Sequence, residues 1–173
     1  MKILLRTLLY LALIVWLGAE IFFPIAAAVT FTTLRPDTHA AGLIVGQLLR
    51  ILHEMGLVSG ILALAMFALA PVAGVYKRRN VFAPMALLLL MICLTLYSQF
   101  SIIPAMEQDR VAAGGVIEAA DVANPSRIDF EKLHHRAEHV EETILLLGLV
   151  TVALGAGAGT ALETVLKRAF NRR

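Results

Sequence analysis

The stretch that decides the fold class is residues 7–34, TLLYLALIVWLGAEIFFPIAAAVTFTTL, in which Glu20 is the single charged residue. A helix rises 1.5 Å per residue, so roughly 20 apolar residues cross the hydrocarbon core of a bilayer, which is about 30 Å thick. This stretch is longer than that, and longer than the apolar region of about 7–15 residues in a secretory signal peptide. It therefore predicts a transmembrane helix that stays in the protein.

Three further stretches have the length and composition of membrane spans, namely residues 55–76, 81–106 and 143–162. The chain has 173 residues, of which 59% are hydrophobic and 16% charged, whereas charged residues make up about 25% of a typical soluble domain. We therefore expect an all-α, four-helix transmembrane bundle that contacts the lipid bilayer and forms a single domain over residues 1–173. Its predicted helices cover about 4–34, 38–76, 81–108 and 127–168.

The basic residues predict the orientation of the bundle, because cytoplasmic segments of membrane proteins are enriched in lysine and arginine. With four crossings, one side of the membrane receives Lys2, Arg6, Lys77, Arg78, Arg79, Lys167, Arg168, Arg172 and Arg173. The connection over residues 107–142 is rich in acidic residues and falls on the other side. This pattern favours cytoplasmic termini in a bacterial inner membrane. The second and fourth helices should extend beyond the outer surface, the fourth after a capping box formed by Ser126 and Asp129.

Several function classes find no support in the sequence. There is no basic surface of the kind that binds nucleic acid, no serine nucleophile motif, no phosphate-binding glycine loop and no HExxH zinc-protease motif. The single cysteine, Cys93, excludes an intrachain disulfide. We therefore expect a protein that is not an enzyme.

Polar side chains interrupt the spans in their outer halves: Glu20, Gln47, Arg50, His53, Glu54 and Gln99. Ionisable groups at membrane depth usually face the bundle interior, so these residues predict a shared polar pocket near the outer surface. One interpretation is a structural plug of paired charges, in which Arg50 pairs with Glu54 and Glu20. The other is a binding site for a ligand, in which Gln47, Arg50, Glu54 and Gln99 shape the pocket.

A metal ion is one candidate ligand, because histidines one helical turn apart can bind the same ion. His135 and His139 have this spacing, and His53 could add a third imidazole from the second helix. Imidazole and carboxylate ligands suit zinc or oxidised copper. The candidate metal residues are His53, His134, His135, His139 and Glu20. A haem held by two of these histidines is a further alternative.

Pairs of glycines four residues apart predict close approach between helices. These pairs are Gly42 with Gly46, Gly56 with Gly60, and Gly155 with Gly159. They fit packing within one four-helix bundle. They equally fit a homo-oligomer, or docking of the chain as an accessory subunit into a larger membrane complex.

Short motifs along most of the chain resemble a known family. They are Trp16-Leu17-Gly18, Phe22-Phe23, Ala41-Gly42 with Gly46, Pro104, and Phe130 four residues before His134. The chain resembles bacterial membrane proteins with a domain of unknown function that are related to human transmembrane protein 205, and more distantly the copper-resistance D type. The resemblance implies the membrane fold but no established activity, and its copper kinship favours a metal near His134. Family members typically carry serine and asparagine where this chain has Ala137 and Glu141.

Together these patterns predict a non-enzymatic membrane protein that handles a metal ion or small solute at an outer polar pocket. The alternatives are an accessory subunit of a membrane complex and a haem-binding membrane protein.

Overall fold

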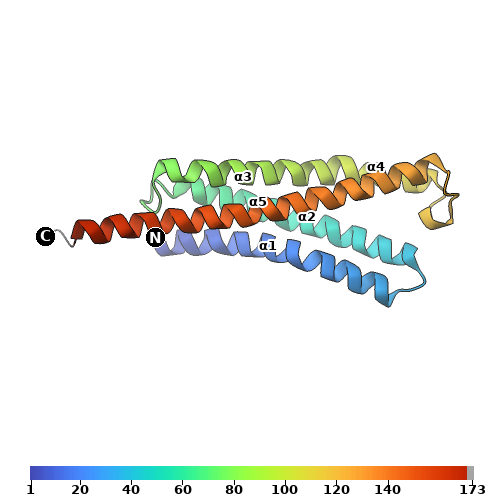
Figure 1. The fold of residues 1–173 in the computed structure, drawn as a ribbon, viewed down its shortest axis with the longest axis horizontal. Helices are drawn as coiled ribbons and strands as arrows, with labels where there is room; N and C mark the ends of the chain where they lie inside the picture. The colour runs from blue at the N-terminus through green and yellow to red at the C-terminus, as the bar shows by residue number, and fades with distance from the viewer. Residues whose placement is uncertain (171–173) are drawn as a thin grey trace.

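The computed structural model describes the backbone of residues 1–170 and the surroundings of the side chains of residues 1–157. The described residues form helices and contain no strand. Four long helical segments run the length of the molecule (Figure 1). They are α1 (Lys2–Thr33), α2 (Thr38–Leu69), α3 (Arg78–Tyr97) continued by η1 (Ser98–Ile102) and α4 (Ile103–Ala112), and α5 (Pro125–Phe170). A short 3-10 helix, η2 (Ile117–Ala119), lies in the connection before α5.

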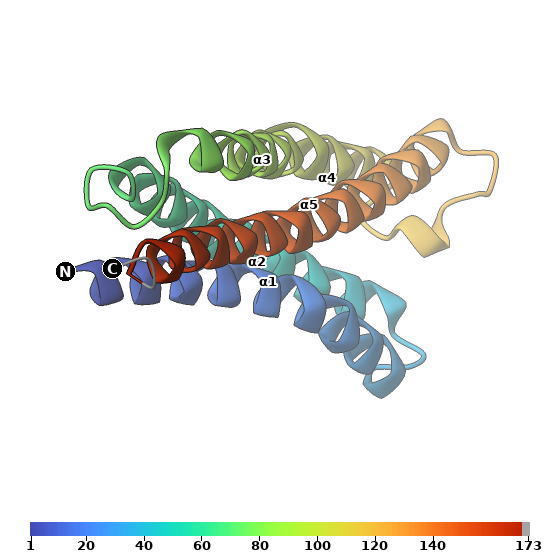
Figure 2. The ribbon, with the colours of Figure 1, turned by 60° about the vertical axis from the view of Figure 1, so that its left-hand side comes forward.

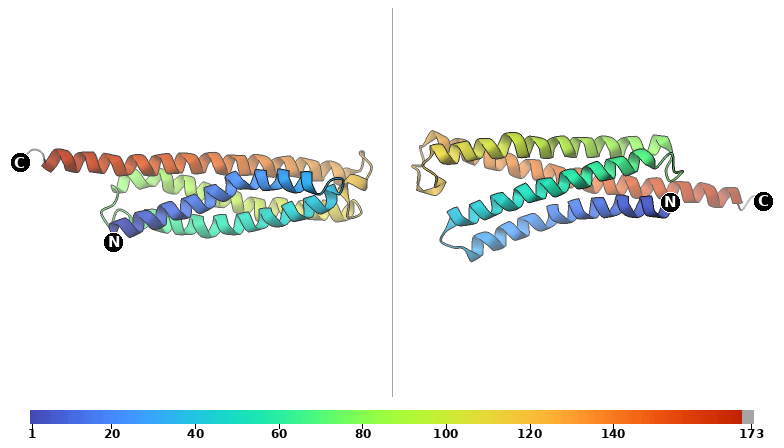
Figure 3. Two further views of the ribbon diagram at one scale, coloured as in Figure 1. Left: turned by 90° about the horizontal axis from the view of Figure 1, so that it is seen from below. Right: turned by 180° about the vertical axis from the view of Figure 1, so that it is seen from behind.

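The helices form a closed ring of neighbours. The main contacts join α1 to α2, α2 to α3, α3 to α5, and α5 back to α1. The start of α1, the turn between α2 and α3 and the end of α5 lie at one end of the bundle, and the opposite end carries the α1–α2 turn and the α4–α5 connection (Figures 1 and 2). We call this opposite end the distal end. At the other end α5 extends past its neighbours (Figure 3), since its 46 residues correspond to about 69 Å of helix.

All four long segments of the described chain are long and apolar enough to cross a membrane, which confirms the predicted four-helix transmembrane bundle. Large apolar side chains remain exposed on their outward faces, among them Val58 at 69%, Ile61 at 61% and Leu146 at 63%. A soluble protein rarely exposes continuous apolar surface of this kind, whereas lipid covers it without cost. The chain is an integral membrane protein.

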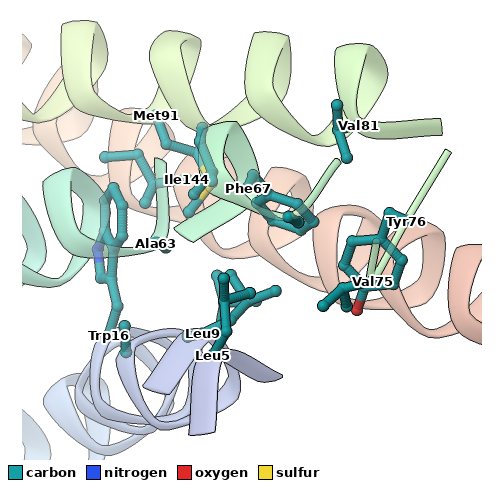
Figure 4. Close-up of a cluster of buried hydrophobic side chains, with 14 residues drawn as sticks. Leu5, Leu9, Trp16, Ala63, Phe67, Val75, Tyr76, Val81, Met91 and Ile144 are labelled. Carbon is teal, nitrogen blue, oxygen red and sulfur yellow. The ribbon is translucent and has the colours of Figure 1, made fainter. Parts of the chain in front are cut away.

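The bundle interior is an apolar core contributed by all four helices. Leu9 and Leu13 of α1 face Phe67 of α2, Leu88 and Met91 of α3, and Ile144 of α5, and all are almost fully buried. Figure 4 shows this cluster, with the Trp16 indole entering it from α1. The buried positions on each helix recur at intervals of three and four residues, which is the spacing of one helical face.

The ends of two helices differ from the sequence-based expectation. We expected the second helix to reach residue 76, but α2 ends at Leu69. Pro71 lacks the N–H that would continue the helix, and Gly74 has a φ of 65°, so the chain turns at residues 70–76. The predicted capping box of Ser126 and Asp129 is also wrong. The α5 helix begins at Pro125, and the Asn124 side chain accepts the hydrogen bond from the Ser126 N–H at 2.9 Å.

The third span contains a π-helical turn that the sequence analysis did not predict. The α-helical hydrogen bonding of α3 stops at Tyr97, continues as a π-turn over Ser98–Ile102, and resumes in α4. Pro104, the second residue of α4, lies just after the π-turn and has no N–H to donate a backbone hydrogen bond. Such single π-turns are often found at functional sites, and this one carries two polar side chains into the bundle.

Candidate functional site

Five polar side chains meet inside the bundle, well away from both ends of the helices. They come from all four long segments and are Glu20 of α1, His53 of α2, Ser98 and Gln99 of η1, and Glu141 of α5. We call this group the His53 cluster. Of the residues that the sequence analysis singled out, the cluster includes Glu20, His53 and Gln99.

His53 is the centre of the cluster, and 1% of its surface is exposed. Its Nδ1 lies 2.8 Å from Oε1 of Gln99, and its Nε2 lies 2.9 Å from Oε1 of Glu141. Both ring nitrogens are therefore in hydrogen bonds. The imidazole bridges α2 to η1 on one side and to α5 on the other.

Glu141 was not among the predicted site residues. Its Oε1 accepts hydrogen bonds from His53 and from the Ser98 hydroxyl at 3.1 Å. Its second oxygen, Oε2, is buried and has no hydrogen-bond partner in the described part of the chain. A buried carboxyl oxygen without a hydrogen-bond partner is costly in free energy, which distinguishes this atom from the other polar atoms of the cluster.

Glu20 is the second carboxyl group of the cluster and is only 5% exposed. Its Oε1 accepts a hydrogen bond of 3.0 Å from the Trp16 indole N–H, one turn earlier on α1. Glu20 also interacts electrostatically with both Glu141 and His53. The two carboxyl groups therefore lie close enough to the imidazole to influence each other's charge.

The Trp16 indole is held in place by two glycines of α2. A Cβ atom added to Gly56 would lie 2.6 Å from the indole Nε1, and one added to Gly60 would lie 2.5 Å from its Cζ3. Any larger side chain at either position would displace the ring. This predicted glycine pair therefore packs within the chain and directs the indole N–H towards Glu20.

The other predicted glycines behave differently. A Cβ at Gly42 or Gly46 would meet nothing within 4 Å, so this pair makes no close helix contact in the chain. Gly155 approaches Phe67, with 3.3 Å between the added Cβ and the ring. Its predicted partner, Gly159, lies outside the residues whose side-chain surroundings are described. Gly148, which was not predicted, packs tightly against Leu17.

The predicted pocket-shaping residues of α2 do not join the cluster. Gln47, Arg50 and Glu54 are exposed. The described ion pairs do not include Arg50 with Glu54 or with Glu20, and Arg50 instead interacts with Glu107 of α4. The predicted plug, with Arg50 as its cation, is therefore wrong. Gln99 is the one residue of the predicted pocket-shaping set that contacts His53.

The histidines of α5 lie on the surface, with 52% of the His134 side chain, 72% of His135 and 79% of His139 exposed. His134 and His135 pair with Glu138, and His139 with Glu142, all on the same helix. Within the described residues, no group of three or more histidine, cysteine or acidic side chains is placed to hold one metal ion. The structure thus separates these histidines from His53 and Glu20.

Sequence reasoning could have found Glu141 from helical spacing. The described buried positions of α5 are Ala137, Ile144, Gly148, Thr151 and Gly155, which are successively seven, four, three and four residues apart. Glu141 occupies the place in this series between Ala137 and Ile144. Ser98 likewise continues the buried face of α3 from Met91 and Thr95. Each helix thus presents polar side chains within an otherwise apolar inward face.

Comparison with known proteins identifies the family but no function. The domain of unknown function DUF4149 matches residues 11–113, which reach from α1 to the end of α4. This range includes Glu20, His53, Ser98 and Gln99, while Glu141 lies beyond it. No curated protein matches the chain, and no solved structure matches it. Because the match covers more than half of the 173 residues, this four-helix membrane protein belongs to the DUF4149 family.

Proposed function

We propose that this chain is a non-enzymatic membrane protein that works by taking up and releasing a proton at the His53 cluster. The observation that carries the proposal is the position of His53, hydrogen-bonded through both ring nitrogens inside a membrane-spanning bundle. Histidine and carboxyl side chains are costly at membrane depth and mark proton relays in pumps and transporters. The chemistry of this cluster is that of proton exchange between an imidazole and two carboxyl groups.

The charge balance of the cluster supports this proposal. Two carboxylates and one imidazolium together carry one net negative charge. The hydrogen bonds and charge interactions described for Glu20, His53 and Glu141 include no lysine or arginine. An unpaired charge inside a bilayer is unfavourable by several kcal/mol or more, so the cluster gains stability by holding one additional proton. The unpartnered Oε2 of Glu141 is one atom that can carry it.

A resident metal or haem fits the described residues less well. His53, Glu141 and Glu20 are suitable ligand types for copper or zinc, but among the described residues no three such side chains are placed to hold one ion. The α5 histidines are solvated and already paired with carboxylates of their own helix. Kinship with transmembrane protein 205 and with copper-resistance D proteins remains a prediction from short motifs, and it supplies no additional ligand.

The side of the membrane is also part of the proposal. The α1 start, the α2–α3 turn and the end of α5 lie at one end of the bundle, where the sequence places most lysines and arginines. The positive-inside tendency then puts both termini in the cytoplasm of a bacterium and the distal end outside. On this placement the cluster lies about 27 Å from Lys2 along α1, beyond the midplane of the bilayer and towards its outer surface.

The single tryptophan provides a direct test, because Trp16 donates a hydrogen bond to Glu20. The purified protein in lipid nanodiscs should show a pH-dependent change in Trp16 emission over roughly pH 4 to 9, where carboxyl and imidazole groups titrate. The Glu20→Gln variant should lose the part of this change that comes from Glu20. Infrared spectra should show a protonated carboxyl band in the wild type that is reduced in Glu20→Gln or Glu141→Gln. A matched Glu142→Gln variant should behave as wild type, because Glu142 is exposed.

Proteoliposomes would show whether proton exchange is coupled to movement across the membrane. The wild type should dissipate an imposed pH gradient faster than Glu20→Gln and His53→Leu at equal protein content. A wild type that showed neither a titration of Trp16 emission nor a protonated carboxyl band would overturn the proposal.

A second candidate function, as a subunit of an oligomer or larger complex, is favoured by Gly42 and Gly46. Gly42 is exposed and both glycines face open space within the chain, as in a helix surface that another helix could approach. Cross-linking in native membranes through an introduced Gly42→Cys, in a Cys93→Ser background, would test it. A chain that remains monomeric under these conditions would contradict this second candidate.

A further inference from the structure

The Gln99 amide can offer either a hydrogen-bond acceptor or a donor to His53, whose ring needs a different partner in its charged and neutral forms. The amide oxygen is only an acceptor and the amide nitrogen is only a donor. In the structure Oε1 faces Nδ1 of His53 at 2.8 Å. The Nε2 side of the ring faces the Glu141 carboxyl group, which accepts.

When Glu141 is ionised, the donor and acceptor roles in this arrangement are those of the charged imidazole. A ring nitrogen that faces an acceptor must carry a proton, and here both do when Glu141 is ionised. A neutral imidazole carries only one proton. If it kept the proton on Nε2 for Glu141, its bare Nδ1 would point at the Gln99 oxygen, and two acceptors would face each other.

Rotation of the Gln99 amide by half a turn removes this conflict, because it brings the amide N–H to the bare Nδ1. We infer that Gln99 is a positioning residue that reverses its amide when His53 gains or loses a proton, so that the imidazole stays hydrogen-bonded in both states. This inference rests on the proposed proton exchange at the His53 cluster. Glutamate at this position would favour the charged ring, and a purely apolar side chain would form a hydrogen bond with neither the charged nor the neutral ring.

The π-turn lies where two consecutive residues contact two different helices: Gln99 contacts His53 on α2, and Ser98 donates to Glu141 on α5. The α3–η1 segment lies between α2 and α5 in the ring of helices, so adjacent residues can face its two neighbours. The titratable groups facing His53 are Glu20 from α1 and Glu141 from α5. From η1, Gln99 alone bonds the imidazole, and it carries no charge.

The test follows the protonation of His53 by nitrogen NMR of histidine-labelled protein in nanodiscs, using Gln99→Met, Gln99→Glu and the control Gln47→Met. Gln47 is exposed on α2, so its replacement should leave the His53 midpoint unchanged. We expect Gln99→Met to move the midpoint at least one pH unit lower, a tenfold loss of proton affinity, because the charged ring loses the stronger hydrogen bond. Gln99→Glu should move it by a similar amount to higher pH, since a carboxylate beside the ring favours its charged form.

The wild type itself provides a second readout that does not depend on variant folding. The side-chain amide signal of Gln99 should shift with pH and share its midpoint with the His53 ring. A His53 titration that is unaffected by either Gln99 variant, with an amide signal insensitive to pH, would overturn this inference while leaving proton exchange intact. A wild type in which His53 does not titrate would overturn both the inference and the proposed function.

Discussion

Two regions of this molecule contain histidines and glutamates, but they differ in how deeply these side chains are buried and in which helices supply their partners. At the level of His53, one histidine and two glutamates are enclosed by four helices; His53 and Glu141 are hydrogen-bonded across helices, and Glu20 interacts electrostatically with both. At the distal end of α5, three histidines and several glutamates are exposed and pair only along their own helix. The comparison shows that histidine content alone does not locate a site in a membrane protein. Burial and partners from other helices do.

The difference arises from how many polar residues each helical turn carries. Between residues 131 and 142 nearly every turn of α5 has charges around its circumference, so water must surround most of it. From Thr143 onwards the helix is apolar except on its inward face. Glu141 lies at this boundary and follows the inward face, which is why it belongs to the enclosed region. Its neighbour Glu142 belongs to the exposed one.

The largest expected effect comes from removing the histidine of the enclosed region. His53→Leu would leave Glu141 buried without its imidazole partner, and loss of one member of a buried pair typically costs about 3 to 5 kcal/mol. The double variant His134→Ala, His139→Ala should change stability by less than about 0.5 kcal/mol, because surface substitutions rarely do more. Thermal unfolding in a mild detergent, followed by Trp16 emission, measures both. Equal losses of stability in the two variants would contradict the distinction between the enclosed and the exposed region.

A smaller but sharp contrast is expected between the two glycine pairs of α2. Gly60→Ala would force the added methyl group against the Trp16 ring and the Ile92 side chain, at 2.5 Å and 3.0 Å. Overpacking of this kind costs about 1 to 3 kcal/mol, and displacement of the indole should also change its emission. In Gly46→Ala the added Cβ has no neighbouring atom within 4 Å, so this variant should unfold at or slightly above the wild-type temperature. A destabilised monomeric Gly46→Ala variant would show that the distal part of α2 is packed more closely than the structure indicates.

The smallest contrast concerns two serines of the π-turn. Ser98→Ala removes one hydrogen bond to Glu141, and such bonds in membrane proteins contribute about 0.6 kcal/mol on average. Ser101→Ala is the matched control, because Ser101 lies on the exposed side of the same turn. The midpoint of unfolding should fall slightly in the first variant and stay constant in the second. A loss as large as that of His53→Leu would mean that Ser98 orients the whole cluster and contributes more than one bond.

Most of the fold was predictable because membrane spans are a local property of the chain. An apolar stretch such as residues 7–34 is long enough to cross a bilayer whatever its neighbours do. The start of α2 at Thr38 was also predicted, and in the structure the Asp37 side chain accepts the Ala40 N–H there. The early end of α2 was missed, although Pro71 and Gly74 were visible signals, because the apolar run continued past them. The π-turn was missed because no residue pattern distinguishes it from an α-helix, and Pro104 alone does not specify it.

The candidate site was predicted only in part. Glu20, His53 and Gln99 were selected because each interrupts an apolar span, a criterion that works when burial is set by the membrane. Arg50 and Glu54 met the same criterion, but the structure leaves both exposed and buries His53 beside them. Glu141 failed the criterion because it stands beside other charges, and only its place in the series of buried positions on α5 marks it.

The sequence by itself determined that four helices cross a membrane and that few polar groups lie within them, since hydrophobic length and composition act along each segment independently. Only the tertiary structure decided which of those groups meet. The contacts of His53 join residues 46 and 88 positions apart, and they depend on the rotation of each helix about its axis and on the order of helices around the bundle. A rotation of one residue, about 100°, would carry any of these side chains from the interior to the lipid, and no single segment specifies that angle.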